Sequence, residues 1–146
     1  MEVKAVFFDI DGTLVNDSRT VLKSTEKAIQ SLKEQGILVG LATGRGPFFV
    51  KPFMEQLDLD FAVTYNGQYI FSIDRVISAS PIDKQSLRDL IAYAKKHRKE
   101  ISLGTAEAML GSKIMSFGMS PFSQWTSRFI PKRMARTVSH GFNKVI

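Results

Sequence analysis

Residues 3–14, VKAVFFDIDGTL, decide the fold, because an apolar run is followed at once by Asp9 and Asp11. A continuous apolar run such as Ala5-Val6-Phe7-Phe8, without polar alternation, is typical of a strand covered on both faces in a parallel sheet. Residues i and i+2 of an extended segment point to the same side. We therefore expect the two aspartates to converge beyond the carboxyl end of the strand, where open α/β sheets bind ligands.

Two neighbouring carboxylates repel each other unless a proton or a cation lies between them. Mg²⁺ held by one or two carboxylates and by substrate phosphate oxygens meets this requirement, so the sequence predicts a magnesium site at Asp9 and Asp11. The alternative is a strand followed by an ordinary turn without chemistry, since Asp and Gly are common turn residues.

The pentapeptide Asp9-Ile10-Asp11-Gly12-Thr13 resembles the DxDGT signature of the haloacid dehalogenase (HAD) superfamily, most of whose members are Mg²⁺-dependent phosphohydrolases. The resemblance implies that Asp9 is the nucleophile that forms an aspartyl-phosphate and that Asp11 is the general acid and base. It also implies that Mg²⁺ binds a side-chain oxygen of Asp9 and the main-chain carbonyl of Asp11, and that Gly12 lines the phosphate site.

A βαβ unit follows the acidic motif. We expect a helix from a cap at Ser24 to about Gln35, with Gly36 at the position of a helix C′ glycine. An apolar stripe on this helix is formed by Thr25, Ala28, Ile29 and Leu32. Residues 37–42 are expected to form a second buried strand. A strand, a helix and a strand in this order make a right-handed βαβ crossover, so the first two strands should lie parallel.

The second strand ends in Thr43-Gly44-Arg45-Gly46, with a helix start at Pro47. A hydroxyl donor followed by the backbone amides of a tight turn suits a phosphate oxygen. An ordinary βα loop is the alternative. The HAD resemblance, through GLATGR, favours phosphate binding by Thr43 and the Gly44 amide.

A third strand is expected at residues 61–65, after a helix over 48–57 that contains Pro52. Asn66-Gly67 closes this strand and is a strong hairpin-turn signal. Together with ATGR it also resembles the Cof-type branch of the superfamily, in which this Asn-Gly lies near the active site. Both interpretations can hold. Residues 68–71 and 76–79 are expected to pair as a hairpin, which ends a first domain at about residue 80.

A second domain is expected over residues 81–146. Asp83 is a plausible N-cap for a helix to about Lys99 whose apolar face includes Leu90, and a short strand follows at 101–103. Another helix is expected from Ser120-Pro121 to about residue 129, and a strand at 137–139. In Cof-type proteins this part resembles the beginning of the α/β cap domain. The predicted fold is thus α/β: a partial HAD-like Rossmannoid core with three parallel strands, plus part of an α/β cap.

The composition limits the possible partners and locations. The chain has 146 residues, no cysteine and a net charge of +6, which divides into −2 for residues 1–80 and +8 for residues 81–146. Without cysteine, signal peptide or long apolar run, we expect a soluble cytoplasmic protein that does not cross a membrane. Nucleic-acid binding is not expected, because no aromatic residues alternate with the basic ones. His97 and His140 are expected at the surface.

The sequence departs from the HAD pattern in one respect. The family's third-motif lysine and its acidic GDxxND cluster follow the cap, and neither occurs here. We therefore expect the chain to be the N-terminal part of a family member, truncated before these motifs. The first strand would then lie at a sheet edge instead of the centre, and an apolar edge favours a homodimer.

The predicted function is Mg²⁺-dependent hydrolysis of small phosphorylated metabolites, such as sugar phosphates, through an aspartyl-phosphate. One alternative is a catalytically inactive binding or structural fragment of such an enzyme, because phosphoryl transfer depends on electrostatic positioning that two missing motifs would supply. A phosphomutase with the same nucleophile is another alternative.

Overall fold

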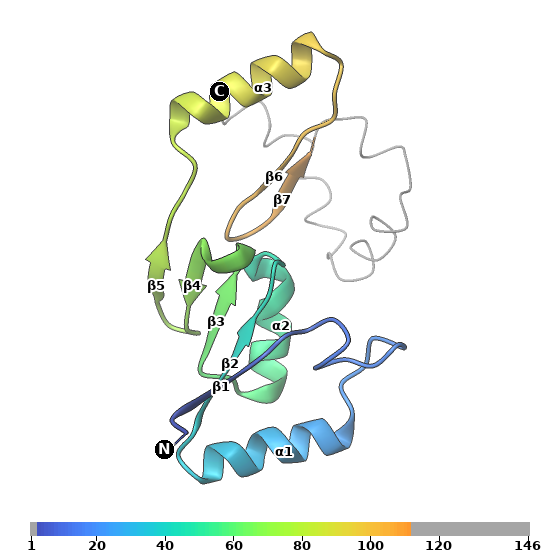
Figure 1. The fold of residues 1–146 in the computed structure, drawn as a ribbon, viewed down its shortest axis with the longest axis vertical. Coiled ribbons are helices and arrows are strands. Elements are labelled where there is room, and N and C mark those ends of the chain that lie inside the picture. The colour runs from blue at the N-terminus through green and yellow to red at the C-terminus, as the bar shows by residue number, and fades with distance from the viewer. Residues whose placement is uncertain (1–2, 112–146) are drawn as a thin grey trace. The chain divides into compact units, whose positions relative to one another are not determined.

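The computed structural model describes residues 3–111. The chain divides into two compact units, residues 1–80 and 81–146, and each is described by itself. Figure 1 shows the elements of both units in chain order.

The first unit is built on a five-stranded sheet in which every strand lies beside its neighbours in sequence. The strand order is β1 (Ala5–Phe8), β2 (Leu38–Ala42), β3 (Phe61–Thr64), β4 (Tyr69–Phe71) and β5 (Val76–Ala79). β1, β2 and β3 are parallel, whereas β4 and β5 are antiparallel to their neighbours. The predicted parallel core of three strands is confirmed. The predicted hairpin also forms, and it extends this core as part of the same sheet.

Two helices connect the parallel strands, α1 (Lys23–Glu34) and α2 (Pro47–Leu57). α1 begins two residues earlier than predicted: its N-cap is Leu22, which makes no side-chain cap bond, so the predicted cap at Ser24 is wrong. Its C-terminus is as predicted, because Gly36 has φ +73° directly after the C-cap, a conformation that suits glycine. α2 begins with Pro47, whose missing N–H is not needed at the first helical position.

Both helices pack on the same face of the sheet. The buried core of the unit joins Ile29 of α1 and Met54 of α2 to Val39 and Leu41 of β2, and to Ala62 of β3. Two right-handed crossovers that step in the same direction along a sheet place their helices on one side. The structure therefore has one covered sheet face in the first unit.

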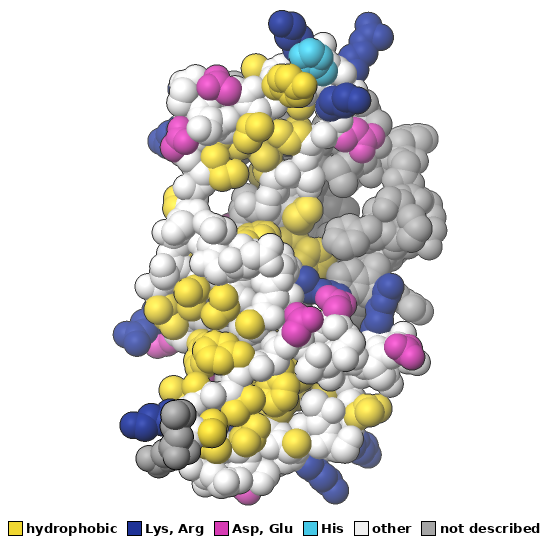
Figure 2. All heavy atoms as spheres, viewed as in Figure 1, with side chains coloured by type: hydrophobic (Ala, Val, Ile, Leu, Met, Phe, Trp, Pro, Cys, Tyr) yellow, Lys and Arg dark blue, Asp and Glu magenta, His cyan; other side chains and the backbone are white. Residues whose placement is uncertain are grey.

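The other face of the sheet is apolar and partly open in the part of the chain that the structure describes. Phe7 of β1 is 51% exposed and Leu38 of β2 is 50% exposed. Figure 2 shows hydrophobic side chains over the region of these strands. The prediction that β1 is covered on both faces is therefore wrong for residues 3–111, because both connecting helices take the opposite face.

β1 stands at one end of the strand order among the described residues, as predicted. Its exposed Phe7 is not isolated, since its ring meets that of Phe61 edge to face, with the ring centroids 4.9 Å apart. Phe61 lies over Gly40 of the intervening strand, where a Cβ atom would come within 2.3 Å of the Phe61 ring. Gly40 therefore makes room for an aromatic contact that spans β1 to β3.

The second unit contains α3 (Lys84–Lys96) and a hairpin of β6 (Ser102–Gly104) and β7 (Met109–Gly111). The predicted N-cap is confirmed, because a carboxylate oxygen of Asp83 accepts hydrogen bonds of 3.0 Å from the backbone N–H groups of Gln85 and Ser86. Leu90 was expected on the buried face but is 48% exposed. His97 is exposed, as predicted.

Some predictions fall outside the described residues. These are the helix after Ser120-Pro121, the strand at 137–139 and the surface position of His140. Among residues 3–111, no helix is both long enough and apolar enough to cross a membrane.

Candidate active site

The register of the parallel strands brings the ends of β1, β2 and β3 to one edge of the sheet. Phe8, the last residue of β1, pairs with Leu41 of β2, and Ala42 pairs with Val63 of β3. Thr43 continues the last pairing, because its N–H donates to the Val63 carbonyl at 2.9 Å. Asp9, Thr43 and the turn after β3 therefore all lie at the carboxyl edge of the parallel strands.

The segment after β1 is fixed by buried residues between the polar ones. Ile10 is fully buried, whereas Asp9 and Asp11 on either side of it are exposed. The carbonyl oxygens of Asp9 and Ile10 accept hydrogen bonds of 3.1 Å from the N–H groups of Leu14 and Val15. These bonds close a tight turn, which anchors the two aspartates on a rigid base.

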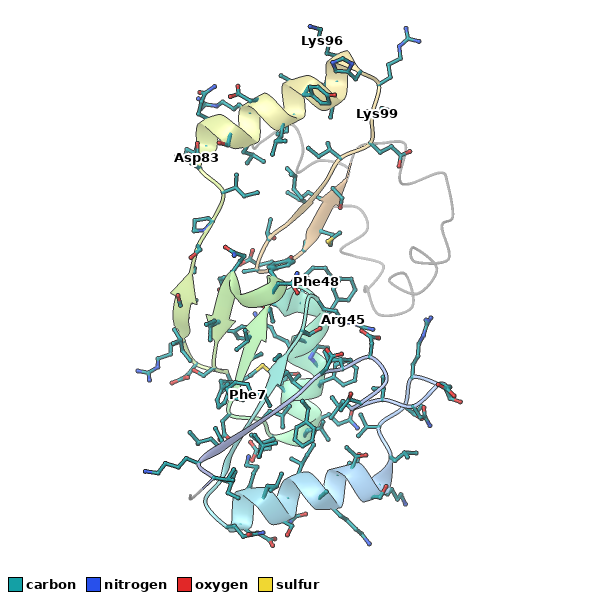
Figure 3. All side chains as sticks on the ribbon, in the orientation of Figure 1. Phe7, Arg45, Phe48, Asp83, Lys96 and Lys99 are labelled. Carbon is teal, nitrogen blue, oxygen red and sulfur yellow. The ribbon has the colours of Figure 1, made fainter. Side chains whose placement is uncertain are left out.

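Asp11 forms a two-pronged ion pair with Arg45 from the loop after β2. The Nε of Arg45 donates to one carboxylate oxygen of Asp11 at 2.8 Å, and its Nη2 donates to the other. The side chain of Arg45 is 15% exposed and that of Asp11 is 61% exposed. Figure 3 shows Arg45 at the end of β2, beside the loop that follows β1. A fork-to-carboxylate pair of this kind fixes orientation as well as charge.

Thr43 begins the loop that was predicted to bind phosphate, and it is 8% exposed. Its hydroxyl oxygen accepts a hydrogen bond of 3.2 Å from the N–H of Arg45, so the loop is folded by its own first side chain. The next residue, Gly44, has an exposed backbone. A tight turn of this type leaves backbone amides at the end of a strand, which is an arrangement that suits an anion.

A strained turn, Tyr65–Gly67, packs against this loop from β3. Its residues Tyr65, Asn66 and Gly67 have φ values of +50°, +54° and +94°. The Asn66 N–H donates to the Thr43 carbonyl at 3.3 Å, and a Cβ atom on Gly44 would lie 3.1 Å from the Asn66 side-chain oxygen. Backbone strain of this kind persists only where surrounding contacts impose it. The structure thus brings Thr43, Gly44 and Asn66 into one cluster.

The hydroxyl of Tyr65 lies over Gly46 at the start of α2. Burial raises the pKa of Tyr65 above its ordinary value of 10.0, so the group is neutral at physiological pH. Its backbone N–H donates to the Arg45 carbonyl at 3.0 Å. Tyr65 therefore contacts the loop through both its backbone and its side chain.

Among the residues that the structure describes, the site contains two acidic side chains, Asp9 and Asp11. Within the part of the chain that the structure describes, no set of three or more His, Cys, Asp or Glu side chains is close enough to hold a metal ion. Asp9 and Asp11 are exposed oxygen donors on a rigid turn, which is the donor type that Mg²⁺ prefers, together with water and phosphate oxygens. The Asp11 carboxylate is engaged by Arg45, so its main-chain carbonyl is the ligand that agrees better with this geometry.

Sequence reasoning did not assign a role to Arg45 or Tyr65. Arg45 lies 34 residues from its partner in the chain, so no local pattern shows the pair. The only signal in the sequence is the position of Arg45, which follows Thr43-Gly44 at a strand end. A cation there could be expected to lie near the two carboxylates and relieve their repulsion. Tyr65 gave no signal, since an aromatic residue at a strand end is common.

Comparison with known proteins places the chain among hydrolases. The family of haloacid dehalogenase-like hydrolases matches residues 6–144. YkrA of Bacillus subtilis (strain 168) is 34% identical over 109 residues, which are 75% of this chain and 42% of YkrA. The pyridoxal phosphate phosphatase YbhA of Escherichia coli (strain K12) is 30% identical over 100 residues, 66% of this chain and 37% of YbhA.

A solved structure agrees in fold. The HAD subclass IIB sugar phosphatase BT4131 superposes with a TM-score of 0.63 at 27% identity, over 77% of this chain and 46% of BT4131. The chain thus spans less than half the length of each of these three proteins. The match over residues 6–144, with Asp9 and Asp11 at the end of the first strand of the sheet, shows that the chain belongs to the haloacid dehalogenase-like hydrolase family.

Proposed function

We propose that the chain carries the nucleophile-bearing part of a Mg²⁺-dependent phosphohydrolase that acts on small phosphorylated metabolites in the cytoplasm. The observation that carries the proposal is the meeting, at one sheet edge, of two aspartates on a rigid turn with the Thr43 loop. The relatives support the substrate class, since YbhA is named for pyridoxal phosphate and BT4131 for sugar phosphates.

The proposed reaction has two steps. In the first, a carboxylate oxygen of Asp9 attacks phosphorus, an aspartyl-phosphate forms, and the bond from phosphorus to the ester oxygen breaks. Asp11 gives a proton to the departing alcohol. In the second, Asp11 takes a proton from water, the water oxygen attacks phosphorus, and inorganic phosphate leaves as the Asp9 carboxylate is restored.

The remaining residues hold the phosphoryl group. The hydroxyl of Thr43 and the amide of Gly44 donate to its oxygens, while Gly12 and Asn66 line the site. Asp9, through its side chain, and Asp11, through its main-chain carbonyl, would hold Mg²⁺. When bound, the ion supplies positive charge that offsets the repulsion between phosphate and carboxylates.

The test compares phosphate release by the chain and by an Asp9→Asn variant, with Mg²⁺ and a panel of sugar phosphates, pyridoxal phosphate and p-nitrophenyl phosphate. Asp17→Asn is the matched control, because Asp17 is an exposed carboxylate on the loop that follows the acidic turn. We expect release by the parent and by Asp17→Asn, dependent on Mg²⁺, and none above background by Asp9→Asn. Equal release by all three proteins would refute the proposal.

A second candidate is a phosphate-binding but inactive part of such an enzyme. The absence of a third acidic group near Asp9 and Asp11 within residues 3–111 favours it, because the metal then has fewer anionic ligands. This candidate predicts no release by any of the three proteins, together with measurable binding of inorganic phosphate. The two candidates are therefore separated by the same set of variants.

A further inference from the structure

The ion pair between Asp11 and Arg45 is unequal in its surroundings. The Arg45 side chain is 15% exposed, whereas the Asp11 side chain is 61% exposed. A cation that is mostly removed from water needs an anionic partner, while an exposed carboxylate is hydrated with or without its partner. Arg45 is therefore the fixed member of the pair, and Asp11 is the member that can leave.

The backbone of Arg45 is held from both sides. Its N–H donates to the Thr43 hydroxyl at 3.2 Å, and its carbonyl accepts from the N–H of Tyr65 at 3.0 Å. The guanidinium thus projects from the same loop that is proposed to hold phosphoryl oxygens through Thr43 and Gly44. The bond from the main-chain N–H of Arg45 to the Thr43 hydroxyl fixes the backbone of Arg45 within that loop.

A guanidinium fork fits a phosphate as well as it fits a carboxylate, because both present two oxygens in one plane at similar spacing. A phosphate dianion carries more charge than the Asp11 carboxylate. Phosphate that reaches the Thr43 loop therefore competes with Asp11 for Arg45, and an exposed Asp11 loses little when it returns to water.

We infer that Arg45 is a phosphate-recognising residue of this site, whose guanidinium passes from Asp11 to a phosphoryl oxygen when a phosphorylated ligand binds. The exchange frees the Asp11 carboxylate only when phosphate is present. Arg45 therefore positions Asp11 as well as binding the ligand. The inference rests on the proposed function, since it assumes that phosphate binds at the Thr43 loop.

The test is a calorimetric titration of the 146-residue chain with inorganic phosphate in the presence of Mg²⁺, which measures the affinity for phosphate. Arg45→Met removes the charge and keeps the aliphatic stem, whereas Arg45→Lys keeps the charge and loses the fork. Lys51→Met is the matched control, because Lys51 is an exposed cation of α2. We expect at least about a tenfold loss of affinity in Arg45→Met, a smaller loss in Arg45→Lys and no change in Lys51→Met.

Asp11→Asn supplies a readout that a merely structural ion pair would not give. Removal of the competing carboxylate is expected to raise the phosphate affinity of the chain about three- to tenfold. This gain should vanish in the double variant Asp11→Asn/Arg45→Met, because no guanidinium is left to be released. A general charge effect would give the same gain in both backgrounds, and that result would overturn the inference.

The outcomes also separate this inference from the function on which it rests. Phosphate binding that is unchanged in Arg45→Met overturns the inference and leaves the phosphate site intact. No phosphate binding by the parent chain overturns both. Thermal unfolding of each variant shows that it is folded, and Arg45→Lys, which retains the cation, provides the comparison if Arg45→Met unfolds.

Discussion

The hydroxyl of Tyr65 occupies the place of a side chain on Gly46, since a Cβ atom there would come within 2.3 Å of the hydroxyl oxygen. The Gly46 backbone, with φ −78° and ψ 160°, is open to any residue, so the glycine is required by space and not by conformation. The contact ties the strained turn after β3 to Gly46, the residue that precedes α2, and with it to the loop that begins at Thr43.

Gly46→Ala is expected to destabilise the first unit by about 1–3 kcal/mol, the usual cost of overpacking. The measurement is the free energy of unfolding in urea. Addition of Tyr65→Phe should recover only part of the loss, because the next ring atom would still lie 2.6 Å from the new Cβ. An unchanged urea midpoint for Gly46→Ala would contradict the contact.

Gly44→Ala provides the matched comparison. The nearest atom to its Cβ would be the Asn66 side-chain oxygen at 3.1 Å, which can move because it ends a flexible side chain. We therefore expect a smaller loss of stability than for Gly46→Ala, together with weaker phosphate binding, since the new methyl group enters the loop. Equal stability losses in the two variants would show that the rigid phenol is not the reason for the difference.

Leu41 and Leu38 belong to the same strand but face opposite sides of the sheet. Leu41 is fully buried beneath the helices, whereas Leu38 is 50% exposed on the open face. Leu41→Ala is expected to cost about 2–5 kcal/mol of unfolding free energy and Leu38→Ala less than about 1 kcal/mol. Similar losses at the two positions, in the same urea titration, would mean that both faces are covered in solution.

The cap of α3 predicts an acid sensitivity of the second unit. Hydrogen bonds from Ser86 and Gln85 lower the pKa of Asp83 below its ordinary value of 3.8. A group whose pKa is lowered by folding stabilises the fold above its unfolded pKa, and this contribution is lost as the pH falls through the lowered value. Helix content should therefore decrease below about pH 3.8 partly because this cap is protonated.

Asp83→Asn keeps a capping oxygen without a titrating group, so it isolates this effect. We expect the difference in melting temperature between the parent and Asp83→Asn to shrink as the pH is lowered from 5 to below 3.8, measured by circular dichroism at 222 nm. A difference that stays constant over this range would rule out a contribution from the Asp83 charge.

The open side of β1 leads us to propose self-association of this 146-residue chain through that strand. An apolar edge strand recruits a partner, and a lysine on such a strand opposes pairing. Phe7→Lys is therefore expected to lower the mass seen by light scattering at high concentration. Leu38→Lys, at a similarly exposed position on β2, which has a strand on each side, is the control and should not change it. A monomer for the parent chain at high concentration would dismiss this proposal.

The helices could be predicted where residues that favour helix ends mark their boundaries. Gly36, Pro47 and Asp83 mark helix ends by local chemistry, and the structure has helix ends at or next to all three. Ser24 misled because a hydroxyl is only one way to begin a helix. The first turn of α1 is set instead by a backbone bond from the Glu26 N–H to the Leu22 carbonyl. β7 was missed, because three residues are too few to show a period.

The site was predictable only as far as its motifs are local. Asp9 and Asp11 could be placed just after the first strand, and Thr43 just after the second, because the end of an apolar run is a local signal. Arg45 and Tyr65 join the site through contacts made across the fold, and such contacts leave no periodic trace in the sequence. The open sheet face could not be predicted either. Phe7 and Leu38 are apolar, and an apolar residue in a strand does not show whether a helix covers its face of the sheet.

The strand order β1 to β5 has a consequence for the way the chain acquires its structure. Among the described residues up to Ser80, each strand pairs with the strand made just before it, so none of these pairings waits for a distant segment. Proteins whose contacts are near in sequence fold fast, and chains fold from the N-terminus as they are synthesised. The sheet edge that carries Asp9, Thr43 and Asn66 can therefore assemble on the ribosome as soon as about eighty residues have emerged.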